Sequence, residues 1–278
     1  MIDSLMTDRD GTLDLIVEKL GMVPNDFYDR DNRNRQQTRQ DRRLTAGVLF
    51  PLHFGNEGFV VHLIKRSKLV PQAGDLGFPG GMLDPFLDRL IMYCMGLRCP
   101  PVMTGKPLRY ARRRGRSSLS TIRLFLANAL RESWEEVRLN PLKVTFLGPL
   151  PSYDLVLFER SIFPLVGFIK DTPRFHANEE VEKIVAIPLR SFFDDANYAA
   201  GIFRKPDGGI HRRDDSDAFP CFIYVDQDRR SEILWGATFQ IIMSFLSIVF
   251  GHHVPPSHEE RIFEIKIPHS YMSGASKA

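Results

Sequence analysis

The segment at residues 129–139, ALRESWEEVRL, places three glutamates and two arginines within eleven residues. A helix turns about 100° per residue, which allows one face to pack while the other carries charge. Four apolar residues share one face of such a helix: Leu126, Leu130, Trp134 and Val137. Three carboxylates share the opposite face: Glu132, Glu135 and Glu136. We therefore predict a helix with one packed face and one acidic face.

The acidic face has two interpretations. Like charges three and four residues apart destabilise a helix by a few tenths of a kcal/mol per pair, so a cation is expected among them. Carboxylate oxygens suit Mg²⁺ or Mn²⁺. Alternatively, Arg131, four residues before Glu135, neutralises part of an ordinary solvated helix face. The helix alone leaves both interpretations open.

A glycine-rich turn upstream favours the metal. Residues 74–85, GDLGFPGGMLDP, follow an apolar run at residues 59–64. Turn and helix together resemble the Nudix hydrolases, whose box reads G-x5-E-x7-R-E-U-x-E-E-x-G-U, with U apolar. Gly81 matches the first glycine of the box. The matches in its helix are Arg131, Glu132, Glu135, Glu136 and Leu139.

Three short segments narrow the resemblance to the coenzyme A pyrophosphatase branch of that family. They are LIKRS at residues 63–67, LGFPGG at 76–81 and ALRE at 129–132. The likeness runs from about residue 44 to about residue 250, with one interruption. It implies an α/β fold, the Nudix-type α/β/α sandwich with a mixed sheet between helices.

The chain departs from the box in its spacing and at three positions. The 49 residues from Met82 to Leu130 exceed the 13 of the box by 36. Leu87 stands where the box has its first Glu, and Asp84 and Asp88 are the alternatives for that role. Two further replacements are Ser133 for an apolar residue and Arg138 for glycine. The branch also carries His-x-Gly before its FPGG, where this chain has Gln72, Ala73 and Gly74. The departures bear on the substrate more than on the catalytic class.

Composition describes a soluble globular protein. The 278 residues are 43% hydrophobic and 26% charged, with a net charge of +3 that names no partner. Three cysteines fit no zinc spacing, which favours a reducing compartment. No secretory signal opens the chain, and the apolar run at residues 239–250 is too short to span a bilayer. We predict a cytoplasmic protein without a membrane partner.

Hydrophobic periodicity predicts the order of elements. Apolar residues at 13, 16, 17 and 20 indicate a short helix ended by Gly21, and residues 26–43 form a polar connector or a solvated helix. Strands are expected at 44–52 and 59–64, as a hairpin, and at 144–150, 161–169 and 219–225; a buried helix is expected at 239–250. We predict an N-terminal extension at 1–43 and a Nudix domain at 44–278, with a basic insertion at 85–123.

The insertion has an apolar half, expected to be a helix, and a basic half. The basic half carries eight cations and no acid: Arg98, Lys106, Arg109, Arg112, Arg113, Arg114, Arg116 and Arg123. Three interpretations apply to it: a nucleic-acid surface, a solvated mobile loop, and a cap whose guanidinium groups grip substrate phosphates. We favour the loop, so a nucleic-acid partner is not the preferred prediction.

Four further residues or pairs invite a functional interpretation beside a structural one. His62 is expected to be a hydrogen-bonded sheet histidine, and Trp235 a core residue of a W-G-x-T segment. Lys65 and Arg66 end a strand, where they contact either a substrate phosphate or solvent; the resemblance favours substrate contact for Arg66. Glu179 or Glu180 completes a metal cluster, acts as a base, or begins a helix.

The resemblance implies a metal-dependent diphosphate hydrolase. Mg²⁺ or Mn²⁺ would be bound by Glu132, Glu135 and Glu136, with Glu136 facing solvent and metal. Glu132 would alternatively accept a proton, Arg131 would orient the carboxylates, and the Gly80–Gly81 turn would bring carbonyl groups near the metal. The catalytic residues are then Arg131, Glu132 and Glu135, and those around the substrate are Arg66, Gly80 and Gly81.

The partner is a small nucleotide, and the oligomeric state is open, a homodimer included. Coenzyme A or acyl-coenzyme A would give 3',5'-ADP and 4'-phosphopantetheine. A first alternative is a Nudix pyrophosphatase acting on ADP-ribose, a dinucleotide or a nucleoside triphosphate. A second is a catalytically weak nucleotide- or RNA-binding module, favoured by the missing first Glu and the basic insertion.

Overall fold

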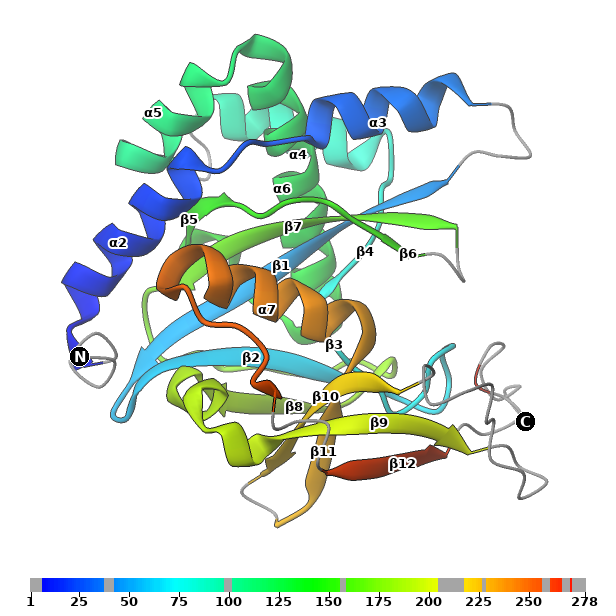
Figure 1. The fold of residues 1–278 in the computed structure, drawn as a ribbon. Helices are drawn as coiled ribbons and strands as arrows, with labels where there is room; N and C mark the ends of the chain where they lie inside the picture. The colour runs from blue at the N-terminus through cyan, green and yellow to red at the C-terminus, as the bar shows by residue number, and fades with distance from the viewer. Residues whose placement is uncertain are drawn as a thin grey trace.

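The computed structural model describes residues 7–37, 43–97, 102–155, 159–204, 218–226, 229–256, 261–266 and 271. Its centre is a mixed sheet with helices on both faces (Figure 1). The α/β class predicted from the sequence is therefore confirmed. Arg98, one of the eight cations of the insertion, lies outside the described residues.

Strand β1 (Leu44–Gly55) organises the main sheet. It forms the predicted hairpin with β2 (Gly58–Arg66) and runs parallel to β7 (Arg160–Ile169). The predicted strands after the acidic helix are present as β5 (Val144–Pro149) and β7. The remaining strands of this sheet are β3 (Leu76–Gly77), β4 (Gly80–Met82), β6 (Tyr153–Leu155) and β8 (Val181–Pro188).

One edge of β1 serves two partners. Its first half pairs with β4, in the register Val48 to Gly80, and its second half pairs with β2. The glycine-rich turn therefore enters the sheet where β2 and β4 separate, and the Leu49 amide donates to the Pro79 carbonyl at 2.9 Å. A Cβ at Gly80 would lie 2.5 Å from the Gly47 carbonyl oxygen, so glycine is required at this close approach.

Alternate side chains of the sheet face two helical layers. Leu49 packs with α6 (Arg116–Val137), α3 (Phe27–Gln36), α4 (Leu87–Gly96) and α5 (Gly105–Arg113). Phe50 packs on the other face with α7 (Gly236–Phe250), the predicted buried helix, and α2 (Arg9–Met22). No described helix is long and apolar enough to cross a membrane.

A second, smaller sheet follows β8 in the chain. It contains β9 (Tyr198–Arg204), the predicted β10 (Phe219–Val225), β11 (Ser231–Leu234) and β12 (Ile262–Lys266). Short 3₁₀ helices lie at Pro141–Lys143, Leu189–Phe193 and Asp195–Asn197. Tyr198 and Phe222 of this sheet join the core beneath α7.

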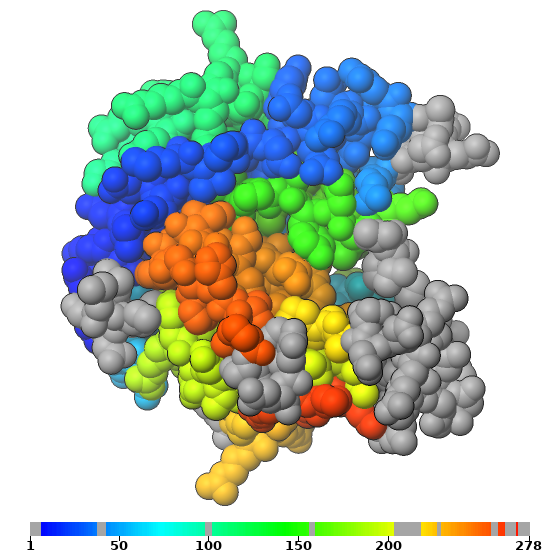
Figure 2. Space-filling view, viewed as in Figure 1, coloured from blue at the N-terminus to red at the C-terminus, as the bar shows by residue number. Residues whose placement is uncertain are grey.

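The N-terminal extension packs closely on the domain. Helix α2 continues one residue past Gly21 and lies between α5 and α7 (Figure 2). The polar stretch after it is helical as α3, and its buried Asn34 donates to the Ser161 hydroxyl at 3.0 Å. The division into an extension, a domain and an insertion stays a prediction.

The insertion is helical in both halves. The apolar half forms α4, as predicted, although Phe86, Leu90 and Leu97 remain exposed. The basic half forms α5 and the first turns of α6, so the expectation of a mobile loop is wrong. The reason is that Leu108 and Ala111, three residues apart on one face of α5, are buried in the core between α6 and the main sheet.

Candidate active site

The acidic helix is the C-terminal half of α6, and one part of its predicted packing face is wrong. Leu126, Leu130 and Val137 are buried, but Trp134 is 44% exposed and lies under the Arg138 guanidinium, 5.5 Å from the ring centre. The inward position belongs to Ser133, whose hydroxyl donates to the Ala129 carbonyl at 2.6 Å. A serine therefore fits where the box has an apolar residue.

The end of α6 explains the glycine of the box. Arg138 adopts a left-handed conformation with φ of 55°, and its amide donates to the Trp134 carbonyl at 3.0 Å. Glycine reaches this conformation without strain. This chain uses arginine and offsets part of the cost through its contact with the Trp134 ring.

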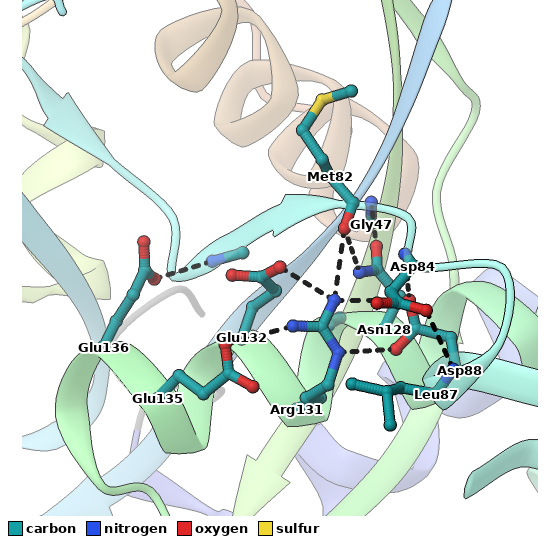
Figure 3. Close-up of polar contacts among 12 residues, drawn as sticks. Gly47, Met82, Asp84, Leu87, Asp88, Asn128, Arg131, Glu132, Glu135 and Glu136 are labelled. Carbon is teal, nitrogen blue, oxygen red and sulfur yellow. Dashed lines mark hydrogen bonds and ion pairs between the residues drawn. The ribbon is translucent and has the colours of Figure 1, made fainter. Parts of the chain in front are cut away.

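The glycine-rich turn and the acidic helix meet despite the insertion between them (Figure 3). The Gly80 amide donates to Glu136 Oε2 at 2.9 Å. A Cβ on Gly81 would lie 2.5 Å from Glu132 Oε2, so Gly81 makes room for that carboxylate. Glu136 is only 5% exposed, and the expectation that it faces solvent is wrong because β4 covers it.

Arg131 gathers the remaining acids, in the geometry the sequence predicted for it. Its Nη2 and Nη1 contact Glu132 at 2.9 Å and Glu135 at 3.0 Å. Its Nε donates to Asp88 Oδ1 at 2.8 Å. Asp88, at the start of α4, is fully buried, whereas Leu87 is exposed. Of the two alternatives for the first Glu of the box, Asp88 is the one that contacts the acidic helix.

Asp84 has a different task. Its Oδ1 accepts the amides of Phe86 and Leu87, both at 2.9 Å, and its own amide donates to Asp88 Oδ2 at 2.7 Å. These hydrogen bonds lower the pKa of Asp84. Asp84 thus shapes the turn into α4 and helps to orient Asp88.

Asn128 is a residue that the sequence analysis missed. It is fully buried, its Oδ1 accepts the Gly47 amide at 2.6 Å, and its Nδ2 donates to the Met82 carbonyl at 3.0 Å. Asn128 therefore fixes β1 and β4 to α6, one helical turn before Glu132. An amide on an otherwise apolar stretch of helix was the available signal, because a buried polar group needs partners.

The electrostatics of the acids call for a cation. Burial raises the pKa of Glu136 to about 8, and the charges of Glu132 and Glu180 act in the same direction. The Gly80 amide and Arg66 oppose the rise. Burial also raises the pKa of Glu132. At neutral pH the Glu136 carboxylate needs further positive charge to stay ionised.

The donor chemistry fits a hard divalent cation. Glu132 and Glu136 flank the Gly80–Gly81 turn, and carboxylate oxygens are the ligands that Mg²⁺ and Mn²⁺ prefer. In this structure Glu132 and Glu135 face Arg131, and the Glu135 side chain is 49% exposed. Within the described residues, no three His, Cys, Asp or Glu side chains converge as a ready-made metal site.

Glu179 and Glu180 lie next to these acids. They form a turn before β8, so the helix-start interpretation is wrong. The Asn178 amide donates to the Glu136 carbonyl at 2.8 Å, and the Ser67 amide donates to the Glu180 carbonyl at 2.8 Å. Because the charge of Glu180 raises the pKa of Glu136, Glu180 is close enough to contribute to the acid cluster.

A cleft of about 660 Å³ opens beside the glycine-rich turn, between the main sheet and α7. Among the described residues, none from the insertion lines it, so the interpretation of the insertion as a cap is wrong. Three predicted site residues line it together: Arg66, Gly80 and Gly81. The sequence analysis missed the contributions of Asp75, Arg160 and Tyr271 to this cleft.

Trp235 lines the cleft and is not a core residue. Its Nε1 donates to Asp75 Oδ1 at 3.2 Å, and the Tyr271 hydroxyl donates to the same carboxylate. Burial nevertheless raises the pKa of Asp75 to about 6. Asp75 comes three residues after Gln72, within the segment that departs from the branch pattern.

Lys65 and His62 have structural surroundings. Lys65 pairs with Glu232 at 3.2 Å and Glu182 at 3.4 Å, which leaves Arg66 as the cation of that segment in the cleft. Both ring nitrogens of His62 are buried without a hydrogen-bond partner among the described residues, so the prediction of a hydrogen-bonded histidine is wrong. Burial and the nearby His53 lower the pKa of His62 to about 4.

Comparison with known proteins supports the predicted superfamily. No model of a known protein family matches the chain. It is 39% identical over 154 residues to an uncharacterized Nudix hydrolase, NudL, of Pectobacterium atrosepticum, a match covering 55% of this chain and 62% of that relative. The NudL of Citrobacter koseri is 26% identical over 200 residues, 70% of this chain and 84% of the relative.

By sequence, the chain is similar to members of the Nudix hydrolase superfamily. The predicted superfamily is thereby supported, and the predicted enzyme class, a Nudix pyrophosphohydrolase, is confirmed. Two solved structures resemble this Nudix hydrolase only in part. A C. elegans Ap4A hydrolase is 12% identical, covering 52% of this chain and 80% of that one at a TM-score of 0.35. A Nudix hydrolase of Alicyclobacillus acidocaldarius is 17% identical, with coverage of 53% and 80% at 0.37.

Proposed function

We propose that this Nudix hydrolase cleaves the diphosphate linkage of coenzyme A or acyl-coenzyme A, giving 3',5'-ADP and 4'-phosphopantetheine or its acyl form. The observation that carries the proposal is the contact of Gly80 with Glu136, which brings the acidic helix to the edge of a 660 Å³ cleft. Arg66, from the segment LIKRS shared with the coenzyme A branch, lines the same cleft. A pocket of this size accommodates a nucleotide.

The residues would divide the chemistry as follows. A diphosphate repels an attacking hydroxide, and a divalent ion supplies charge neutralisation and a bound water of lowered pKa. Glu132, Glu135 and Glu136 would hold that ion. Water forms a bond to one phosphorus, the bridging P–O bond breaks, and the proton passes to Glu132 in its second role as base.

Arg131 and Arg66 would act on the acids and on the substrate respectively. Arg131 already contacts Glu132 and Glu135 at 2.9 and 3.0 Å, so it sets the side-chain directions of both. Arg66 is anchored by its Nε, which donates to the Pro71 carbonyl at 2.8 Å. Its two terminal nitrogens would then form a fork for the diphosphate oxygens.

A substrate panel tests the proposal. The protein is incubated with Mg²⁺ or Mn²⁺ and, separately, with coenzyme A, ADP-ribose, NADH, a nucleoside triphosphate and capped RNA, and products are separated by chromatography. We expect 3',5'-ADP from coenzyme A at the highest kcat/KM. Faster turnover of any other substrate rejects the coenzyme A assignment.

One observation favours the first alternative, ADP-ribose, a dinucleotide or a nucleoside triphosphate. Gln72 stands where the coenzyme A branch has His, and it lines the cleft. The same substrate panel separates this alternative from the coenzyme A proposal. The second alternative, a nucleotide- or RNA-binding module, requires that no substrate turns over and that RNA binding weakens with salt.

A further inference from the structure

We infer that Arg160 binds a substrate phosphate outside the scissile diphosphate, a phosphomonoester on the ribose, and so makes the enzyme select substrates that carry one. The inference rests on the proposed function, because it adds a specificity residue to the same cleft. Arg160 begins β7 and lines the cleft on the same face of the sheet as Ile162.

The surroundings of Arg160 leave its charge uncompensated. Its Nε is buried and has no hydrogen-bond partner among the described residues. None of the ion pairs within that part of the chain involves it; the neighbouring Asp154 is taken by Arg30 and by the Ser161 hydroxyl. A buried guanidinium without an acid is costly, and an anion in the cleft removes that cost.

A second arginine strengthens the case for an anion. Arg66 lines the same cleft, and burial together with the charge of Arg66 lowers the pKa of Arg160. Two like charges that share a half-buried cleft repel each other unless negative charge lies nearby. Among the described residues, two acids line the cleft. Asp75 already accepts from Trp235 and Tyr271, and Asp154 already pairs with Arg30.

The register of the sheet separates Arg160 from the catalytic end. Gly80 pairs with Val48 on one side of β1, and Arg160 pairs with Leu44 on the other. Four residues along the strand and two strand spacings across place their Cα atoms roughly 16 Å apart. Arg66 lines the cleft with Gly80, and its charge influences the pKa of both Glu136 and Arg160, so it is near both groups. The diphosphate therefore belongs to Arg66 and the catalytic end, and Arg160 meets a different group.

The form of the cleft indicates which group. Its walls are mostly apolar, which suits a flat base and its ribose: Ala46, Val48, Phe78, Ile162 and Ile241. A terminal phosphomonoester presents three oxygens to a guanidinium fork, the geometry that arginine binds in a bidentate manner. Both a 3'-phosphate, as in coenzyme A, and a 2'-phosphate, as in NADPH, supply this chemistry.

Two matched substrate pairs distinguish these sources. Coenzyme A is compared with dephospho-coenzyme A, and NADPH with NADH, as kcat/KM ratios with Mn²⁺. We expect the wild type to prefer the phosphorylated member of one pair by about 10- to 100-fold, the size of one or two hydrogen bonds to a charged group. Arg160→Gln should bring that ratio close to one through a higher KM for the phosphorylated member, with a much smaller change for the unphosphorylated member.

Two control variants complete the experiment. Arg160→Lys keeps the charge without the fork and should retain part of the preference. Arg174→Gln removes an exposed arginine outside the cleft and should keep the wild-type ratio. Three outcomes would overturn the inference. The wild type could show a ratio near one in both pairs, Arg160→Gln could keep the wild-type ratio, or Arg160→Gln could lose activity equally on both members of a pair.

A binding measurement separates failure of this inference from failure of the proposed function. If the wild type hydrolyses none of the four substrates, the proposed function is rejected. Calorimetry without metal then compares AMP with adenosine 3',5'-bisphosphate and adenosine 2',5'-bisphosphate. Tighter binding of one bisphosphate, lost in Arg160→Gln, supports the role of Arg160; equal binding of all three rejects it.

Discussion

The protein has two arginine-lined hollows on opposite faces of its main sheet. The cleft beside α7 holds Arg66 and Arg160 within mostly apolar walls. The other, of about 450 Å³ and here called the insertion hollow, lies between α3, α4 and α6. Its lining includes three arginines, Arg35, Arg89 and Arg116, all exposed.

The difference teaches that burial decides where charge does chemistry. In the insertion hollow Arg35 pairs with Asp31 at 2.8 Å, and the other two arginines point into solvent, which screens them. Burial raises the pKa of Asp75, which lines the cleft, to about 6, and that of Glu136, which accepts from Gly80 at the edge of the cleft, to about 8. The insertion carries more cations, yet these two raised carboxyl pKa values lie in and beside the cleft.

The sharpest way to break this comparison is Glu136→Gln. We expect kcat to fall on the order of 1000-fold, comparable with the loss of a principal charge-stabilising group. The fold should survive, because the amide oxygen can still accept from Gly80. Activity with Mn²⁺ is measured beside Glu18→Gln, an exposed control on α2. Full activity in Glu136→Gln would move the site elsewhere.

The same variant gives a stability readout without metal. The folded-state pKa of Glu136, about 8, is above the ordinary glutamate value of 4.5, so its contribution to stability is present below pH 4.5 and is lost as pH rises through about 8. At pH 8.5 the metal-free Glu136→Gln protein should therefore melt at a higher temperature than the wild type. Thermal unfolding at pH 6 and pH 8.5, with and without Mn²⁺, checks this.

The sequence was sufficient for the acidic helix and the glycine-rich turn and insufficient for the cleft. Regular spacing predicted the acidic face of the helix, and the resemblance predicted that Gly81 and this helix meet across the insertion. Trp134 was misplaced because the rotation of α6 is set by where it packs on β1 and β4, and Asn128 makes those contacts.

Arg160 and Asp75 could not be found from local pattern. Arg160 reaches the cleft because β7 pairs with β1 in a parallel register, a contact between residues 116 positions apart. Asp75 acquires its partners from Trp235 and Tyr271, distant in the chain. Their roles depend on topology, whereas the acidic helix depends on local periodicity.

His62 tests the effect of burial away from both hollows. Its folded-state pKa, about 4, is below the ordinary histidine value of 6.5 that applies to the unfolded chain. The unfolded chain therefore binds more protons than the folded protein between these two pH values. Stability is full above pH 6.5 and falls by about 3 kcal/mol as pH drops towards 4. In His62→Leu this part of the acid sensitivity should disappear. Urea unfolding at pH 7 and pH 4.5 measures it, with the exposed His176→Leu as a control that keeps the wild-type sensitivity.

Asp88→Asn should weaken catalysis from a distance. It leaves Arg131 with a weakened buried partner, so Glu132 and Glu135 lose their fixed directions. We expect kcat to fall about 10- to 100-fold with KM little changed, and Asp88→Glu to restore part of it. A variant that melts earlier but keeps kcat would show that Asp88 supports only the fold.

The smallest effect is expected in the insertion hollow. Arg89→Gln combined with Arg116→Gln removes two exposed charges, and neither residue lines the cleft. Because salt screens exposed charges outside the cleft, kcat/KM should change less than about twofold at 0.15 M ionic strength. The ratio of coenzyme A to dephospho-coenzyme A turnover should also stay at its wild-type value. A large loss at low salt that is abolished at high salt would mean that the insertion steers the substrate by its long-range field, and burial would then no longer be what separates the two hollows.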